Sequence, residues 1–167
     1  MNHKRYYKWG CLTLNFERNN WRETIRQLVH EEDLYNRKGY GYENSPHCTI
    51  LSGFNDDINI FSKIKKYLIC TSEINIKTDT ISIFESGFFD VVKYDVNCEM
   101  LMDLNKTIRS NVECKIDFLI YNPHITIAYA KKGNGNKYLM KLNESIVFKP
   151  VNYSFLHPDG KIDIITI

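Results

Sequence analysis

The chain of 167 residues is long enough to bury a core, and a content of 43% hydrophobic and 13% aromatic residues excludes an intrinsically disordered protein. The formal net charge of +2 excludes a protein that wraps long nucleic acid with an extensive basic surface. Five cysteines without a Cys-x-x-Cys pair argue against a disulfide framework, and no apolar run has the length of a membrane span or of a signal peptide, so we expect a soluble, cytoplasmic protein without a membrane partner.

The first third of the chain predicts a strand, a helix and a second strand. Alternating apolar residues over 9–16 indicate the first strand. Asn19 or Asn20 can cap the helix that follows, and the loop over 36–44, rich in Gly and Tyr, is expected to form a lip of a cleft. The apolar stripe of this helix consists of Trp21, Ile25, Leu28 and Val29.

The rest of the chain repeats this order of elements. Asp56 or Asp57 can cap a helix, strands are expected at 74–77, 80–84 and 88–96, and a helix and a strand follow them. The apolar residues that recur at helical spacing in these two helices are Ile58, Phe61, Ile64 and Leu68, then Leu101, Leu104 and Ile108. The tail alternates again at Ile162, Ile164 and Thr166. We therefore expect one bilobal α+β domain over 1–167, with diverged halves at about 9–85 and 86–167, antiparallel-rich sheets around a central cleft, and helices outside.

Two related segments, residues 45–51 (SPHCTIL) and 122–128 (NPHITIA), each carry His-x-Thr at the start of a strand-like run. Residues two apart in a strand share a face, so His47 lies beside Thr49, and His124 lies beside Thr126. The proline before each histidine suits the first position of a strand, where no ladder hydrogen bond is donated. The repetition predicts one site built from two equivalent halves.

Two imidazoles in one cleft suit phosphodiester cleavage. One can take a proton from the attacking hydroxyl while the other gives a proton to the leaving oxygen, and each such group contributes roughly 10²–10⁴-fold to the rate. The hydroxyls of Thr49 and Thr126 can hold the non-bridging phosphate oxygens. This scheme needs no metal and no cofactor. A metal site made of His47, His124 and Cys48 is disfavoured, because Cys48 should point to the other face of its strand.

The paired Pro-His-x-Thr-Ile segments resemble the 2H phosphoesterase superfamily. Within it, the chain is most similar to the anti-CBASS phosphodiesterases, with which phages destroy the cyclic-oligonucleotide signals of bacterial immunity, and to their viral relatives. The residues that carry this narrower resemblance are Gly41-Tyr42, 90–96 (DVVKYDV), 121–129 (YNPHITIAY) and 131–133 (KKG). The resemblance implies a bilobal fold, catalysis by the two His-x-Thr pairs, and hydrolysis of cyclic di- or trinucleotides such as cGAMP for immune evasion.

Residues in loops near the motifs are candidates for substrate binding. Tyr42, Phe54 and Phe88 could stack on bases, and Lys131 could attract a phosphate. Packing on a strand edge, or a solvated basic loop, is the ordinary alternative for each of them. Two other functions also stay open: action on linear RNA, such as 2′,5′-oligoadenylate or 2′,3′-cyclic phosphate ends, and a non-catalytic module that sequesters cyclic nucleotides.

Overall fold

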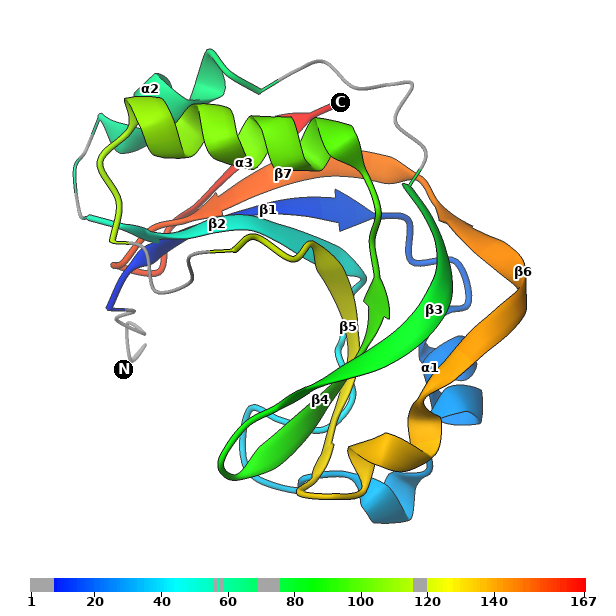
Figure 1. The fold of residues 1–167 in the computed structure, drawn as a ribbon. Helices are drawn as coiled ribbons and strands as arrows, with labels where there is room; N and C mark the ends of the chain where they lie inside the picture. Colours follow the sequence, from blue (N-terminus) through cyan, green and yellow to red (C-terminus); the bar gives the residue numbers. More distant parts are fainter. Residues whose placement is uncertain (1–7, 56, 58, 69–75, 116–119) are drawn as a thin grey trace.

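The computed structural model describes residues 8–55, 57, 59–68, 76–115 and 120–167. Eight antiparallel strands form a single curved sheet in the order β6-β3-β4-β5-β2-β1-β7-β8 (Figure 1). The strands are β1 (Gly10–Phe16), β2 (His47–Phe54), β3 (Ile76–Glu85), β4 (Phe89–Asp95), β5 (His124–Lys131), β6 (Met140–Phe148), β7 (Pro150–Leu156) and β8 (Ile162–Thr166). The helices are α1 (Trp21–Leu28), α2 (Ile60–Lys65) and α3 (Glu99–Asn111), with short 3₁₀ helices η1 (Glu31–Asp33) and η2 (Gly135–Tyr138).

The sheet has two groups of four strands, which meet where β2 and β5 lie side by side at its centre. We call β2, β1, β7 and β8 the first lobe, and β5, β4, β3 and β6 the second lobe. Figure 1 shows the sheet curving around a concave face, with the helices outside the curve. The predicted α+β architecture with antiparallel strands and external helices is therefore confirmed, although one continuous sheet takes the place of several.

The helices pack across the two lobes. Helix α1 connects β1 to β2 of the first lobe, yet its Trp21 ring packs on Tyr94 of β4 and Phe148 of β6, with centroid distances of 6.5 and 6.2 Å. Helix α3 connects β4 to β5 of the second lobe, yet the Asn105 amide donates to the Ile50 carbonyl of β2 at 2.6 Å. Each of these helices thus covers the apolar outer face of the other lobe.

Several details of the sequence prediction change. The separate strands expected at 74–77 and 80–84 form one strand, β3, because a register shift between Thr78 and Thr80 absorbs the irregularity that suggested a break; residues 74 and 75 lie outside the described part. Asn20 precedes α1 in a left-handed conformation, with φ of 49°, and makes no side-chain cap. Asn59 occupies the cap position of α2, and its backbone N–H donates to the Asp57 carboxylate at 2.8 Å. Asp56 and Ile58 lie outside the described residues.

Strands β6 and β7 were not predicted. The apolar and polar residues of β6 do not alternate clearly, whereas in β7 the apolar Val151, Tyr153 and Phe155 do alternate with Asn152 and Ser154, and this signal was missed. Most side chains of β6 are exposed or half-buried, as befits an edge strand. Helix α3 and strand β8 occur where their patterns predicted them. Within the described ranges, no helix is both long and apolar enough to cross a membrane.

Candidate active site

The two motif strands β2 and β5 are neighbours, paired through Cys48 and Ile125. Those two side chains are fully buried on the outer face, so the alternation of the strands places His47, Thr49, His124 and Thr126 on the concave face. The His47 imidazole is close enough to His124 to lower the pKa of His124. The sheet therefore brings the two predicted pairs together in the middle of the concave face.

Both imidazoles are oriented by the same backbone contact. Nδ1 of His47 lies 3.0 Å from the Ser45 carbonyl, and Nδ1 of His124 lies 2.9 Å from the Asn122 carbonyl. A carbonyl oxygen only accepts hydrogen bonds, so each Nδ1 carries the proton and donates it. Nε2 of both rings is left as the nitrogen that can exchange a proton with a ligand.

His124 lies in surroundings that favour its neutral form. Burial lowers the pKa of His124 most, and the positive charge of Lys93 and the proximity of His47 lower it further. The Asn122 carbonyl and the Asp95 carboxylate act in the opposite direction without cancelling the effect. The Phe84 ring lies nearly perpendicular to the imidazole, at a centroid distance of 4.8 Å.

A buried ammonium group lies beside this pair. Lys93, only 4% exposed, is the cross-strand partner of Thr126. Its Nζ donates to the Ser82 hydroxyl at 2.6 Å and to the Asp95 carboxylate, and it lies 4.2 Å from the centre of the Phe84 ring. The second lobe thus presents a fixed positive charge and its counter-ion to the site.

The first lobe presents uncharged groups at the corresponding place. Asn15 is the cross-strand partner of His47, and Thr13 is the partner of Thr49. The Asn15 amide donates to Asn152 at 2.7 Å and to Ser154 at 2.9 Å, and the hydroxyls of Thr13 and Ser154 are 2.8 Å apart. The two histidines have similar sequence surroundings but different electrostatic surroundings.

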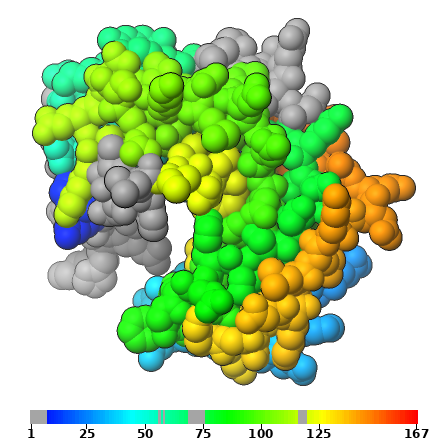
Figure 2. All heavy atoms as spheres, viewed as in Figure 1, coloured from blue at the N-terminus to red at the C-terminus, as the bar shows by residue number. Residues whose placement is uncertain are grey.

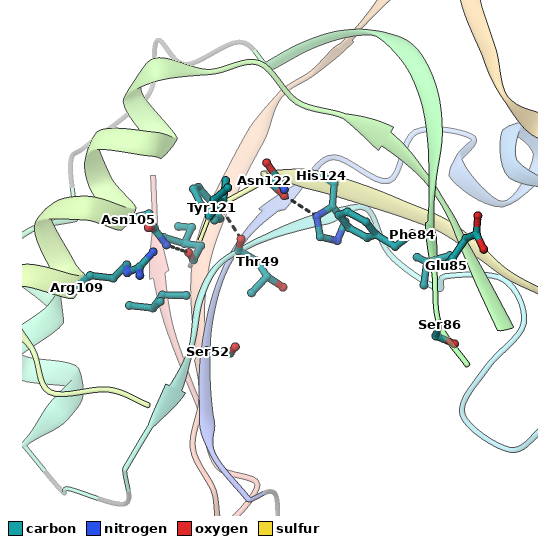
Figure 3. A pocket seen from close by; sticks show the side chains of 14 residues that line it. Thr49, Ser52, Phe84, Glu85, Ser86, Asn105, Arg109, Tyr121, Asn122 and His124 are labelled. Atoms are coloured by element: carbon teal, nitrogen blue, oxygen red, sulfur yellow. Dashed lines mark hydrogen bonds between the residues drawn. The ribbon is translucent and has the colours of Figure 1, made fainter. Parts of the chain in front are cut away.

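A cavity of about 640 Å³ adjoins the site between α3 and β3. Figure 3 shows Thr49 and His124 pointing into this space, with Arg109 of α3 on one side and Phe84 of β3 on the other. The Tyr121 hydroxyl donates to the Thr49 carbonyl at 3.0 Å and holds the wall beside the motif strand. The surface is visibly hollowed between the part with α3 and the part with the β3–β4 hairpin (Figure 2). The mainly apolar walls and few polar groups are typical of a small-molecule site.

The residues predicted to bind substrate lie elsewhere. Phe54 is fully buried and packs on Phe155, so the expectation that it stacks on a base is wrong. Tyr42 is turned toward α1, because its hydroxyl donates to the Val29 carbonyl at 2.6 Å, and it does not border the site as expected. Lys131 ends β5 and donates to the Glu32 carbonyl at 2.7 Å, seven residues, or about 23 Å along the strand, from His124. Phe88, 75% exposed, lies at the tip of the β3–β4 hairpin.

Cys48 is fully buried on the opposite face from the histidines, as its strand position predicted. Burial raises the pKa of its thiol to about 11, which disfavours the thiolate. Across the described ranges, no group of three His, Cys, Asp or Glu side chains is arranged to hold a metal ion.

Sequence reasoning missed the lining residues Phe84, Asn105, Arg109 and Tyr121, and also Lys93. The lining comes from segments far apart in the sequence, so no local pattern reveals it. Lys93 had a detectable signal, since it lies two residues from Asp95, on the same face of the strand predicted at 88–96, whose other residues apart from Asp90 are apolar or aromatic.

Solved structures share this fold at low sequence identity. Usb1 of Kluyveromyces marxianus matches with a TM-score of 0.66 and 7% identity over 95% of this chain and 98% of its own. E. coli LigT in complex with 3′-AMP matches with a TM-score of 0.60 and 10% identity, over 95% of this chain and 94% of its own. A crystal structure of a phosphoesterase matches with a TM-score of 0.58 and 11% identity, over 96% of both chains. No protein-family model and no curated protein matched the sequence. The 2H phosphoesterase-like fold expected from the motifs is thus confirmed.

Proposed function

We propose that the protein is a metal-independent phosphodiesterase that cleaves cyclic di- or trinucleotide signals such as cGAMP and so counters host cyclic-nucleotide immunity on behalf of a virus. The observation that carries the chemistry is the pair of imidazoles, both held through Nδ1 with Nε2 left free on one concave face. Binding alone does not require two titratable groups placed in this way.

Each residue has a distinct role in the proposed reaction. Nε2 of neutral His124 takes the proton of the attacking hydroxyl, which belongs to water or to the adjacent ribose 2′-position, as the oxygen bonds to phosphorus. The bond between phosphorus and the leaving oxygen breaks, and protonated Nε2 of His47 gives that oxygen its proton. Thr49 and Thr126 donate hydrogen bonds to the non-bridging oxygens, where negative charge develops.

The assignment of His124 as base rests on the difference between the lobes. Burial, and to a smaller extent the positive charge of Lys93, lower the pKa of His124 and favour the neutral imidazole. A base must be unprotonated when the substrate binds, whereas the acid must carry a proton. His47, beside the uncharged Asn15 and Thr13, therefore takes the complementary role.

Three observations support a small nucleotide as substrate. The cavity beside Thr49 and His124 is in the size range of small-molecule sites and has the aromatic rings of Phe84 and Tyr121 in its lining. LigT, which shares the fold, has been solved with 3′-AMP, ATP and NADP+. The net charge of +2 is also modest for an enzyme of long nucleic acids. The resemblance to anti-CBASS enzymes favours cyclic oligonucleotides within this class.

The test is incubation of the purified protein, in EDTA, with 3′,3′- and 2′,3′-linked cyclic dinucleotides, cyclic tri-adenylate, 2′,5′-oligoadenylate and RNA with a 2′,3′-cyclic phosphate end. We expect cleavage of cyclic substrates and a loss of at least about 10²-fold in His47→Ala. His30→Ala removes an exposed histidine outside the site and is the matched control. Cleavage of linear substrates only would contradict the proposed substrate, and binding without cleavage would indicate a sequestering module.

A further inference from the structure

Four aromatic rings gather at the end of the concave face away from the histidines. Tyr40 contacts Phe89 and Tyr129 at centroid distances of 4.9 and 5.2 Å, and Tyr35 contacts Tyr40 and Phe89 at 5.3 and 5.4 Å. Phe89 and Tyr129 are 5.5 Å apart. We call these four residues the aromatic cluster.

The cluster lies on the same face as the candidate active site. Phe84, Val91 and Tyr129 form one cross-strand row over β3, β4 and β5. Phe84 and Val91 also line the cavity that contains His124. An apolar strip therefore runs without a break from the cavity to the cluster, and a ligand in the cavity can extend along it.

The loop between η1 and β2 presents Tyr40 to this face. The Tyr129 backbone N–H donates to the Gly41 carbonyl at 2.8 Å, and the Tyr35 backbone N–H donates to the Tyr129 carbonyl at 2.9 Å. Gly39 and Gly41 on either side of Tyr40 have φ of 92° and 101°, which other residues rarely adopt. Tyr40 remains 43% exposed, so part of its ring is free to contact a ligand.

The spacing indicates a second nucleotide. Along β4, Asp95, opposite His124, and Val91, opposite Tyr129, are four positions apart, which is about 13 Å. The nucleoside next to the scissile phosphate can occupy the cavity lined by Phe84. The aromatic cluster lies farther from the histidines, so it suits the base of another nucleotide. The Arg37 guanidinium, 5.5 Å from the centre of the Tyr35 ring, adds positive charge that suits a phosphorylated ligand.

We propose that Tyr40 and Phe89, supported by Tyr35 and Tyr129, bind a second nucleobase of the substrate by stacking. This inference rests on the proposed function and deepens it, because it assigns to the enzyme substrates with at least two bases. Stacking tolerates any base, so the site selects for the size of the substrate more than for its sequence.

The test compares a cyclic dinucleotide with uridine 3′-(4-nitrophenyl phosphate), which has one base and a good leaving group. Tyr40→Ala should lower kcat/KM for the cyclic dinucleotide by roughly 5- to 150-fold, the effect of one lost stacking contact, and leave the one-base substrate unchanged. Tyr40→Phe keeps the ring and should behave as wild type on both. Phe89→Leu should show the same selective loss as Tyr40→Ala.

Equal losses on both substrates, or no loss on either, would overturn the second base site. Thermal melting identifies a variant that is merely unfolded, in which case the other variant decides. If the wild type cleaves neither substrate, the proposed function fails by itself. The dissociation constant of the cyclic dinucleotide, measured in a His47→Ala background with and without Tyr40→Ala, then decides the inference: weaker binding without the ring supports it, and an unchanged constant overturns it.

Discussion

Lys93 and Thr126 are direct cross-strand partners, so a buried ammonium group stands beside the second His-x-Thr pair. No charged group has the corresponding position beside Thr49, whose partner on β1 is Thr13. The sheet makes two similar motifs chemically different through the strands that flank them.

Replacing Lys93 should change the pH dependence of the reaction. Lys93→Met removes a cation that lowers the pKa of His124 and leaves Asp95, which raises it, so the pKa of His124 should rise. Because the base must be neutral, the acidic limb of kcat/KM should move to higher pH, with activity lost more at pH 6 than at pH 8. Lys141→Met changes an exposed lysine on β6 and is the control. An acidic limb that stays in place would contradict the role of His124 as base.

The roles of the two histidines can be separated with a modified leaving group. A substrate with sulfur in place of the leaving oxygen needs little protonation of that atom, so it should restore much of the rate lost in His47→Ala. The sulfur substrate should not restore the rate lost in His124→Ala, because that variant lacks the base. Single-turnover rates with the oxygen and sulfur substrates measure the effect. Rescue of His124→Ala alone would mean that the assignment is reversed.

The two threonines should matter mainly for the rate of the chemical step. Thr49→Val and Thr126→Val remove a hydroxyl at nearly constant shape, and each should lower kcat by roughly 10²–10³-fold with little change in KM. Steady-state kinetics check this, with Thr107→Val on the exposed side of α3 as the comparison. A rise in KM with unchanged kcat would instead assign the hydroxyls to ground-state binding.

A buried carboxylate away from the site should stabilise the fold in a pH-dependent way. Asp33 accepts hydrogen bonds from Tyr138, Lys137 and Asn134 at 2.5, 2.9 and 2.7 Å, and the contacts with Tyr138 and then Lys137 lower its pKa. Its stabilising effect is present above the unfolded-state pKa of about 4 and is lost as the pH falls through the lower folded-state value. Urea unfolding should therefore show Asp33→Asn to be less stable than wild type at pH 7, with the difference shrinking below pH 4.

The exposed Asp103→Asn is the control for that experiment. A destabilisation by Asp33→Asn that stays constant from pH 7 to pH 3 would show that packing rather than charge accounts for the contribution.

The sequence was sufficient to predict the two motif strands because their signal is local. The His-x-Thr spacing specifies a shared face from the period of a strand alone, and β2 and β5 follow that rule. Their adjacency was also foreseeable, since two halves of one site must meet. The aromatic residues could not be placed in the same way, because Tyr40 and Tyr42 belong to a loop whose direction is set at Gly41, with its positive φ.

Phe54 illustrates a second limit. It ends β2, and two register shifts between β1 and β2 intervene between the motif and the end of the strand. Each extra residue reverses the face on which the following side chains lie, so the two shifts cancel, and Phe54, seven positions after His47, lies on the opposite, buried face. The error was to assign Phe54 to a loop beside the cleft, because it is the last residue of β2. The cavity could not be predicted either, because its walls are set by how α3 packs on β2.

The crossing of α1 and α3 bears on how such a chain could arise. A chain with only the unit from β1 to β2, or only the unit from β4 to β5, would carry a helix whose apolar face fits the missing lobe. Such a half could cover its own strands only by exchanging helices with a second copy of itself. On this geometry a half-length chain would need to form a domain-swapped dimer, and duplication and fusion of its gene would join two partners that are already interlocked.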